Sequence, residues 1–131
     1  MSLNPNNYAH GAQEMTFQYS QWINYMTLID YYGEPAFSIT VQLVSAHKPR
    51  GMELKIEAGP YKGYSTGAVG TPTGMKTVTK DARVLIDNIT TSYTGSGRGQ
   101  GHHTVLFFFV PNNIKADTGT YKVNVVYTLM Q

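Results

Sequence analysis

Cysteine is absent from the 131 residues of this chain, and charged side chains make up only 14% of them. Without thiols the chain has neither disulfides nor thiolate metal sites. No apolar run reaches the roughly 18 residues that a membrane-spanning helix needs. The net charge of +2 is small and the basic residues are dispersed, so nucleic acid is not an expected partner.

The residues that are plentiful favour β-structure. The chain holds 13 glycines and 10 tyrosines, and 41% of its residues are hydrophobic. This mixture is typical of strands joined by polar turns, whereas helices prefer Ala, Glu, Lys and Leu. A chain of this length buries about two-thirds of its unfolded surface in one domain. We expect residues 1–13 to form an extended polar tail and residues 14–131 to form a single domain.

Apolar and polar residues alternate along several short segments, as in half-buried strands. The clearest is Phe37 to Leu43, followed by a second at Met52 to Ala58 that completes a hairpin. Turn signals recur about every ten residues, which predicts an antiparallel β-sandwich of seven to eight strands. The expected strands are 15–19, 22–29, 37–43, 52–58, 82–89, 102–110 and 121–129. Residues 59–74 and 90–101 are expected to be loops, the first with room for a short edge strand.

The last segment combines a tight corner with a long alternating strand. Asp117 and Gly119 supply turn chemistry, and Tyr121 begins a face that continues with Val123 and Val125. This Asp-x-Gly-x-Tyr spacing resembles the corner before strand F of immunoglobulin-like domains. The resemblance implies an immunoglobulin-like fold in which the hydroxyl of Tyr121 bonds back to the backbone.

No further strand follows this segment in the sequence, and bacterial pilus subunits are similar in this respect. They lack the last strand and receive it from the N-terminal extension of a neighbouring subunit. The resemblance implies that residues 5–19, with Met15, Phe17 and Tyr19, are a donated strand. In the alternative, this segment closes the sandwich within its own chain and needs no partner. In both cases the strand that closes the fold against the final segment is expected near the start of the chain.

Several loop residues suit a binding patch. Tyr61, Tyr64 and Tyr93 lie in or beside the two long loops, together with Arg98. A tyrosine offers a flat apolar face and a hydroxyl, which suits stacking on sugars and contact with proteins. If both loops lie at one end of the sandwich, these residues share a surface. In the alternative, the tyrosines cap the core and Arg98 lies in solvent.

No pattern supports catalysis or a cofactor. His102 and His103 are adjacent, so in a strand they point to opposite faces and do not form a metal site together. The glycines of residues 95–101 lack the Lys-Ser/Thr and the helix of a phosphate loop. Glu53 and Glu57 are expected on the solvent side of a strand. No nucleophile elbow is present, so the chain is not expected to be an enzyme.

The sequence therefore predicts a non-enzymatic structural or adhesion-type domain, similar to a pilin subunit, without a cofactor. Its expected partner is a protein, either another copy or a neighbouring subunit. One alternative is a carbohydrate-binding module that uses the loop tyrosines, and another is a phage or virion structural protein. The first residues read as an expression start on a mature domain whose signal peptide has been removed. The expected location is extracellular or on the cell surface.

Overall fold

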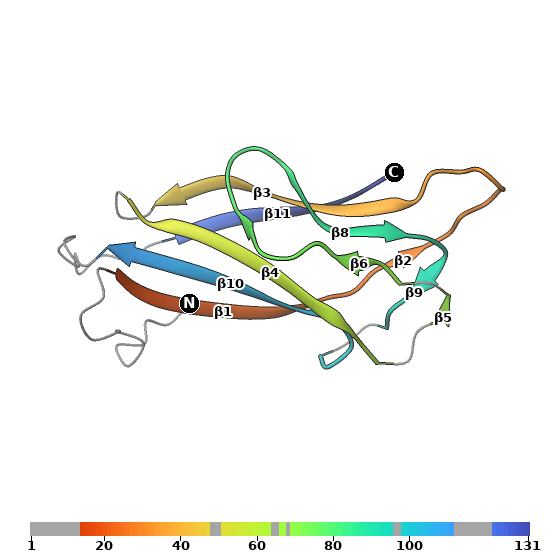
Figure 1. Ribbon diagram of the computed structural model, residues 1–131, viewed down its shortest axis with the longest axis horizontal. Coiled ribbons are helices and arrows are strands. Elements are labelled where there is room, and N and C mark those ends of the chain that lie inside the picture. The colour runs from red at the N-terminus through yellow and green to blue at the C-terminus, as the bar shows by residue number, and fades with distance from the viewer. Residues whose placement is uncertain (1–13, 48–50, 64–65, 68, 96–97, 112–121) are drawn as a thin grey trace.

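The computed structural model describes residues 14–47, 51–63, 66–67, 69–95, 98–111 and 122–131. Every regular element in these ranges is a β-strand (Figure 1). All strand pairs are antiparallel. The prediction of an all-β fold is thus confirmed. The described part has six long strands and five strands of two residues, whereas the sequence predicted seven to eight.

The strands form two four-stranded sheets and one small sheet of three strands. The first sheet has the order β1 (Glu14–Ile23), β10 (Gly101–Pro111), β4 (Glu53–Lys62) and β7 (Lys76–Thr77). The second sheet has the order β11 (Lys122–Met130), β3 (Phe37–His47), β8 (Arg83–Ile89) and β6 (Thr71–Pro72). The small sheet has the order β2 (Met26–Thr27), β9 (Ser92–Tyr93) and β5 (Thr66–Gly67), and it lies at the right end of Figure 1.

The two large sheets enclose one hydrophobic core. Most of its side chains come from β4 and β10 on one side and from β3 and β8 on the other, and Tyr25, Met52 and Val78 lie just outside the strands. Alternation places these residues correctly, because every second side chain of a strand points to the same face. The predicted inward residues of the 52–58 hairpin arm are all buried, while Glu53 and Glu57 are exposed as expected.

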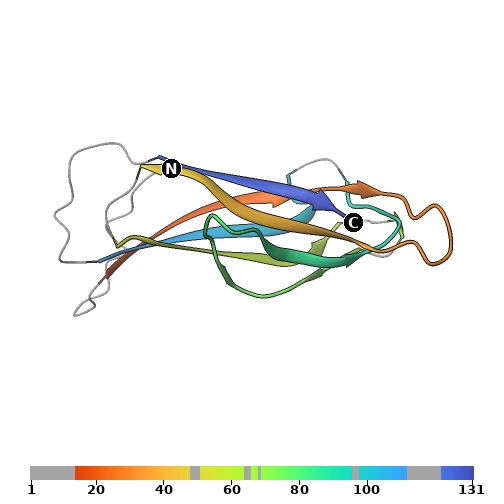
Figure 2. The same ribbon diagram turned by 90° about the horizontal axis from the view of Figure 1, so that it is seen from above.

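Both strands near the chain ends lie at sheet edges. β1 pairs with β10 of its own chain along its whole length, from Glu14 opposite Pro111 to Ile23 opposite His102. β11 pairs with β3 and follows it in Figure 2. The expectation that the final strand closes against a segment near the start is wrong for the described strands. β1 and β11 belong to different sheets and do not pair with each other.

The predicted strand 22–29 is interrupted. Its first residues continue β1, and the chain then turns at Asn24 and Tyr25 into β2. The backbone N–H of Tyr25 donates to the Thr94 hydroxyl at 2.9 Å, and the Tyr25 carbonyl accepts from the backbone N–H of Thr94 at 3.1 Å. These bonds direct the chain out of the first sheet and into the small sheet. Partners 69 residues away along the chain cannot be read from a local pattern.

The two long loops meet in space. The 59–74 segment extends β4 to Lys62 and supplies β5 and β6, and the 90–101 segment supplies β9. β5 pairs with β9, with Thr66 opposite Tyr93 and Gly67 opposite Ser92. The two segments that the sequence predicted as loops therefore lie at the same end of the molecule.

Candidate functional site

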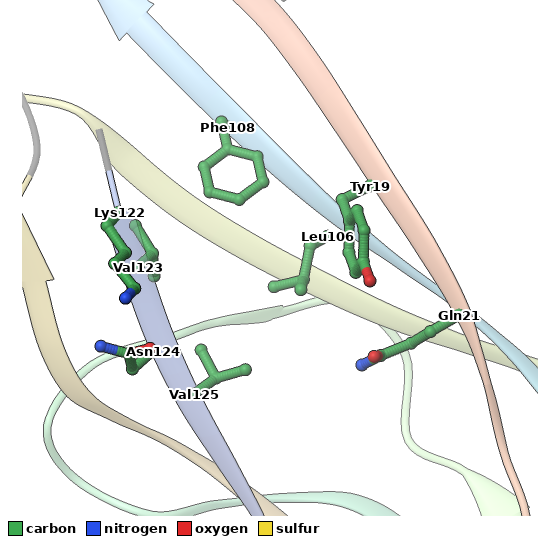
Figure 3. Close-up of a pocket in the computed structure, with 8 residues that line it drawn as sticks. All are labelled: Tyr19, Gln21, Leu106, Phe108, Lys122, Val123, Asn124 and Val125. Carbon is green, nitrogen blue, oxygen red and sulfur yellow. The ribbon is translucent and has the colours of Figure 1, made fainter. Parts of the chain in front are cut away.

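A groove opens along one side of the molecule, between the edge strands of the two large sheets. It has a volume of about 370 Å³ and is lined by residues of β1, β10 and β11 (Figure 3). The lining residues are Tyr19, Gln21, Leu106, Phe108, Lys122, Val123, Asn124 and Val125. We call this side of the molecule, with β1 and β11 as its borders, the open side.

The groove has an apolar floor and a polar rim. Leu106 and Phe108 of β10 form the floor and are only 5% and 4% exposed. Val123 and Val125 of β11 are half-buried and pack against the core. Tyr19 is 47% exposed and borders the groove on the opposite side. Of the residues that line the groove only Lys122 is charged, so the groove suits an apolar protein segment better than an ionic ligand.

One contact joins the two borders of the open side. The Nε2 amide of Gln21 on β1 donates to the hydroxyl oxygen of Tyr127 on β11. The pKa of Tyr127 is raised to about 12: burial raises it most, the hydrogen bond from Gln21 lowers it, and the neighbouring Tyr19 adds a smaller increase. Tyr127 is therefore a neutral phenol at every ordinary pH. The contact ties the first sheet to the second at this point by a side-chain bridge, not by strand pairing.

A second cluster of polar side chains is buried next to the small sheet. His102 is fully buried, and its Nδ1 lies 2.9 Å from the carbonyl oxygen of Gly59. A carbonyl can only accept, so Nδ1 carries the proton and Nε2 is left to accept from the Tyr25 hydroxyl at 3.0 Å. The Tyr25 oxygen in turn accepts from the backbone N–H of Gly70 at 2.8 Å. Each group in this series has a partner of the correct kind.

Burial shifts the titration of both side chains in this cluster. It lowers the pKa of His102, and the hydrogen bond to the Gly59 carbonyl raises it by a smaller amount. Burial raises the pKa of Tyr25, against the smaller effect of its bond from Gly70. Both groups are therefore neutral near pH 7. The cluster ties β10 and β4 to the segments that carry the small sheet.

The two adjacent histidines do not form a metal site together. The ring of His103 packs against Trp22 at a centroid distance of 4.9 Å, whereas His102 points into the core. Across the described residues no group of three or more His, Asp or Glu side chains is arranged to hold a metal ion. Likewise, no helix in the described ranges is long and apolar enough to cross a membrane.

The structure describes three of the four residues of the predicted loop patch, Tyr61, Tyr93 and Arg98. The Tyr61 hydroxyl donates to the Thr94 carbonyl at 3.1 Å, and its ring contacts His102 edge-on. Tyr61 thus caps the buried cluster. Tyr93 is 43% exposed on β9, and Arg98 is exposed. Tyr64 lies outside the described residues, so the shared surface of all four stays a prediction.

Of the other predicted site residues, three lie outside the described ranges and three lie in β1. The corner residues Asp117, Gly119 and Tyr121 lie outside the described residues. The backbones of Met15 and Phe17 lie in β1, opposite Val110 and Phe108. Tyr19 lies on the same strand and borders the groove.

Sequence reasoning did not find the groove as a site. It placed Val123 and Val125 on one face of the last strand, but it did not bring Gln21, Leu106 or Phe108 next to them. One feature of the sequence could have indicated the groove, namely the two alternating strands near its two ends. Which sheet each strand joins depends on pairing over about 90 residues, from β1 to β10, and periodicity does not specify it.

The chain matches no protein-family model, no curated protein and no solved structure in the three comparisons with known proteins.

Proposed function

We propose that this chain is a non-enzymatic structural subunit of the adhesion or pilin-like kind, and that it assembles with other copies through the open side. The observation that carries this proposal is the groove between two long edge strands. β1 has ten residues and β11 has nine, and in the described part of the chain each pairs with one neighbour only. A free strand edge presents unpaired N–H and C=O groups, which are satisfied best by another strand.

The lining of the groove supports the same proposal. An added protein segment would cover Val123 and Val125, which are half-buried in the single chain. Burying apolar surface stabilises an interface by about 25 cal/mol per Å² before the cost of association is subtracted. An extracellular location is consistent with this role and remains part of the proposal.

Sedimentation velocity over a range of protein concentrations tests this function. We expect the wild-type chain to associate, and Tyr19→Lys to weaken the association by at least about tenfold, because a charge would be buried at the border of the groove. Ser20→Lys is the matched control, since Ser20 is the next residue of β1, is also exposed and does not line the groove. A wild-type chain that stays monomeric at about millimolar concentration, a usual limit for specific contacts, would contradict the proposal.

Glycan binding is a second candidate, and the exposed ring of Tyr93 favours it. Met26 lies directly opposite Tyr93 in the small sheet and is 73% exposed. Together they present an aromatic and a thioether side chain on one surface. Binding to a glycan array that is lost in Tyr93→Ala would favour this candidate over assembly.

A further inference from the structure

The edge strand β11 lacks the features that usually prevent edge-to-edge association. Natural edge strands carry charged residues, especially Lys, or Pro along their length. In β11 the single charged residue is Lys122, the first of the strand, and residues 123–130 contain neither charge nor proline. A long uncharged edge of this kind pairs readily with another strand.

The outward face of β11 is also partly apolar. Val126 is 43% exposed and Met130 is 47% exposed. Val44 on the neighbouring strand β3 is 62% exposed. The opposite border of the open side differs, because the exposed outward residues Gln18 and Ser20 of β1 are polar. Among the exposed outward residues, those of β11 thus include apolar side chains, whereas those described in β1 are polar and Tyr19 faces the groove.

We propose that two copies of this chain pair β11 with β11, antiparallel and related by a two-fold axis at Val126. This inference rests on the proposed function and names its contact. Val126 is the central residue of the nine in β11, so this register pairs the whole strand with itself. Residues directly opposite each other then always lie on the same face, as an antiparallel sheet requires.

This register is chemically self-complementary. On the core-facing side, Val123 lies opposite Leu129 and Val125 lies opposite Tyr127, so apolar side chains meet apolar side chains. On the outward side, Asn124 lies opposite Thr128, and Val126 lies opposite its own copy. Lys122 lies opposite Met130, where its aliphatic stem packs on the thioether and its ammonium stays in water. No two like charges face each other, so no cross-strand pair in this register is repulsive.

The same arrangement covers the groove. The second sheets of the two copies become one continuous sheet across the axis, and the open sides of both copies face each other. A two-fold contact of this kind uses the same surface on each partner and closes after two copies. Growth into longer assemblies would then require the other edge, at β1.

A charge exchange at Val126 tests the register. We expect Val126→Lys alone and Val126→Glu alone each to raise the dimer dissociation constant at least about tenfold, because two like charges would lie directly opposite each other. An equimolar mixture of the two variants should restore dimers, since Lys would then lie opposite Glu. The matched control is Val84→Lys, because Val84 is 37% exposed on β8, which has neighbours on both sides. This control should dimerise as the wild type does.

The outcomes separate this inference from the proposed function. If the wild type associates and Tyr19→Lys weakens the association, but both Val126 variants associate normally, β11 pairing is wrong and assembly through the open side stands. If each Val126 variant is monomeric and the mixture remains so, the register centred on Val126 is wrong. A monomeric wild type contradicts both proposals. Circular dichroism melts of all variants exclude loss of the fold as the cause.

Discussion

Replacing His102 by alanine is expected to lower the free energy of unfolding by roughly 4 kcal/mol. The substitution removes the acceptor of the Tyr25 hydroxyl and the donor to the Gly59 carbonyl, both in the interior. Each buried group left without a partner costs about 1–3 kcal/mol, and the lost ring leaves a cavity. Because His102 joins β10, β4 and Tyr25, we expect the end that carries the small sheet to open first.

The conservative variant His102→Gln separates hydrogen bonding from volume. A glutamine amide both donates and accepts, so it can satisfy either Gly59 or Tyr25 and should lose less stability than alanine. Urea unfolding followed by fluorescence measures both variants against the wild type. Equal and small losses, below about 1 kcal/mol, would show that the hydrogen-bond series does not stabilise the fold.

The same residue gives the fold a dependence on pH. Burial lowers the pKa of His102 below its ordinary value of 6.5, so the unfolded chain takes up a proton more readily than the folded chain. The contribution of His102 is therefore fully present above about pH 6.5 and is lost as the pH falls, by up to about 1.4 kcal/mol per unit. As the pH falls, the wild type should lose this contribution and His102→Gln should not, so the difference in stability between the two should shrink.

Replacing Gly101 by alanine is expected to cost a comparable amount, at least about 3 kcal/mol. Gly101 has a φ of +96°, a backbone conformation that an L side chain adopts only with strain. A Cβ atom there would also collide with the backbone carbonyl oxygen of Ile23 and with the side chain of Asn24. The backbone oxygen cannot move without disturbing the pairing of β1 with β10, where Ile23 lies opposite His102.

Gly74 provides the matched control for this substitution. Its φ of +90° is nearly the same, but a Cβ atom there meets nothing within 4 Å. Gly74→Ala therefore measures the backbone strain alone, which is about 1–2 kcal/mol. Thermal and urea unfolding of the two variants should differ by the cost of the collision. Equal losses would mean that the chain can move away from Gly101 freely.

Local periodicity was enough to predict most strands and their buried faces. The alternation in 37–43 and 52–58 identified core residues such as Ile39, Val41 and Ile56. It succeeded there because each of these strands exposes one face to the core and the other to solvent. The break at Tyr25 was missed, since it depends on bonds to the distant Thr94 and not on neighbouring residues.

The candidate site was harder to predict than the fold. His102 looked like the start of an apolar strand, and its burial depends on Tyr25, Gly59 and Gly70 meeting around it. For Tyr61 the sequence left two roles open, an exposed binding residue or a cap on the core, and the extension of β4 to Lys62 brings it onto the buried cluster. The groove depends on which edge each terminal strand occupies. Such choices are made by long-range pairing, and a single strand pattern is compatible with several of them.

The most direct test of this account is a cysteine pair that reports where β1 lies. Ser20 and Val105 are directly opposite each other in the pairing of β1 with β10, and the chain has no other cysteine. Directly opposite residues of antiparallel strands lie within the range that a disulfide spans. In the variant Ser20→Cys with Val105→Cys, we predict a disulfide within one chain, seen as single-chain mass after oxidation under non-reducing conditions. Disulfide-linked multimers would show that β1 is donated to a neighbouring copy, and they would contradict an open side bordered by β1 and β11 of the same chain.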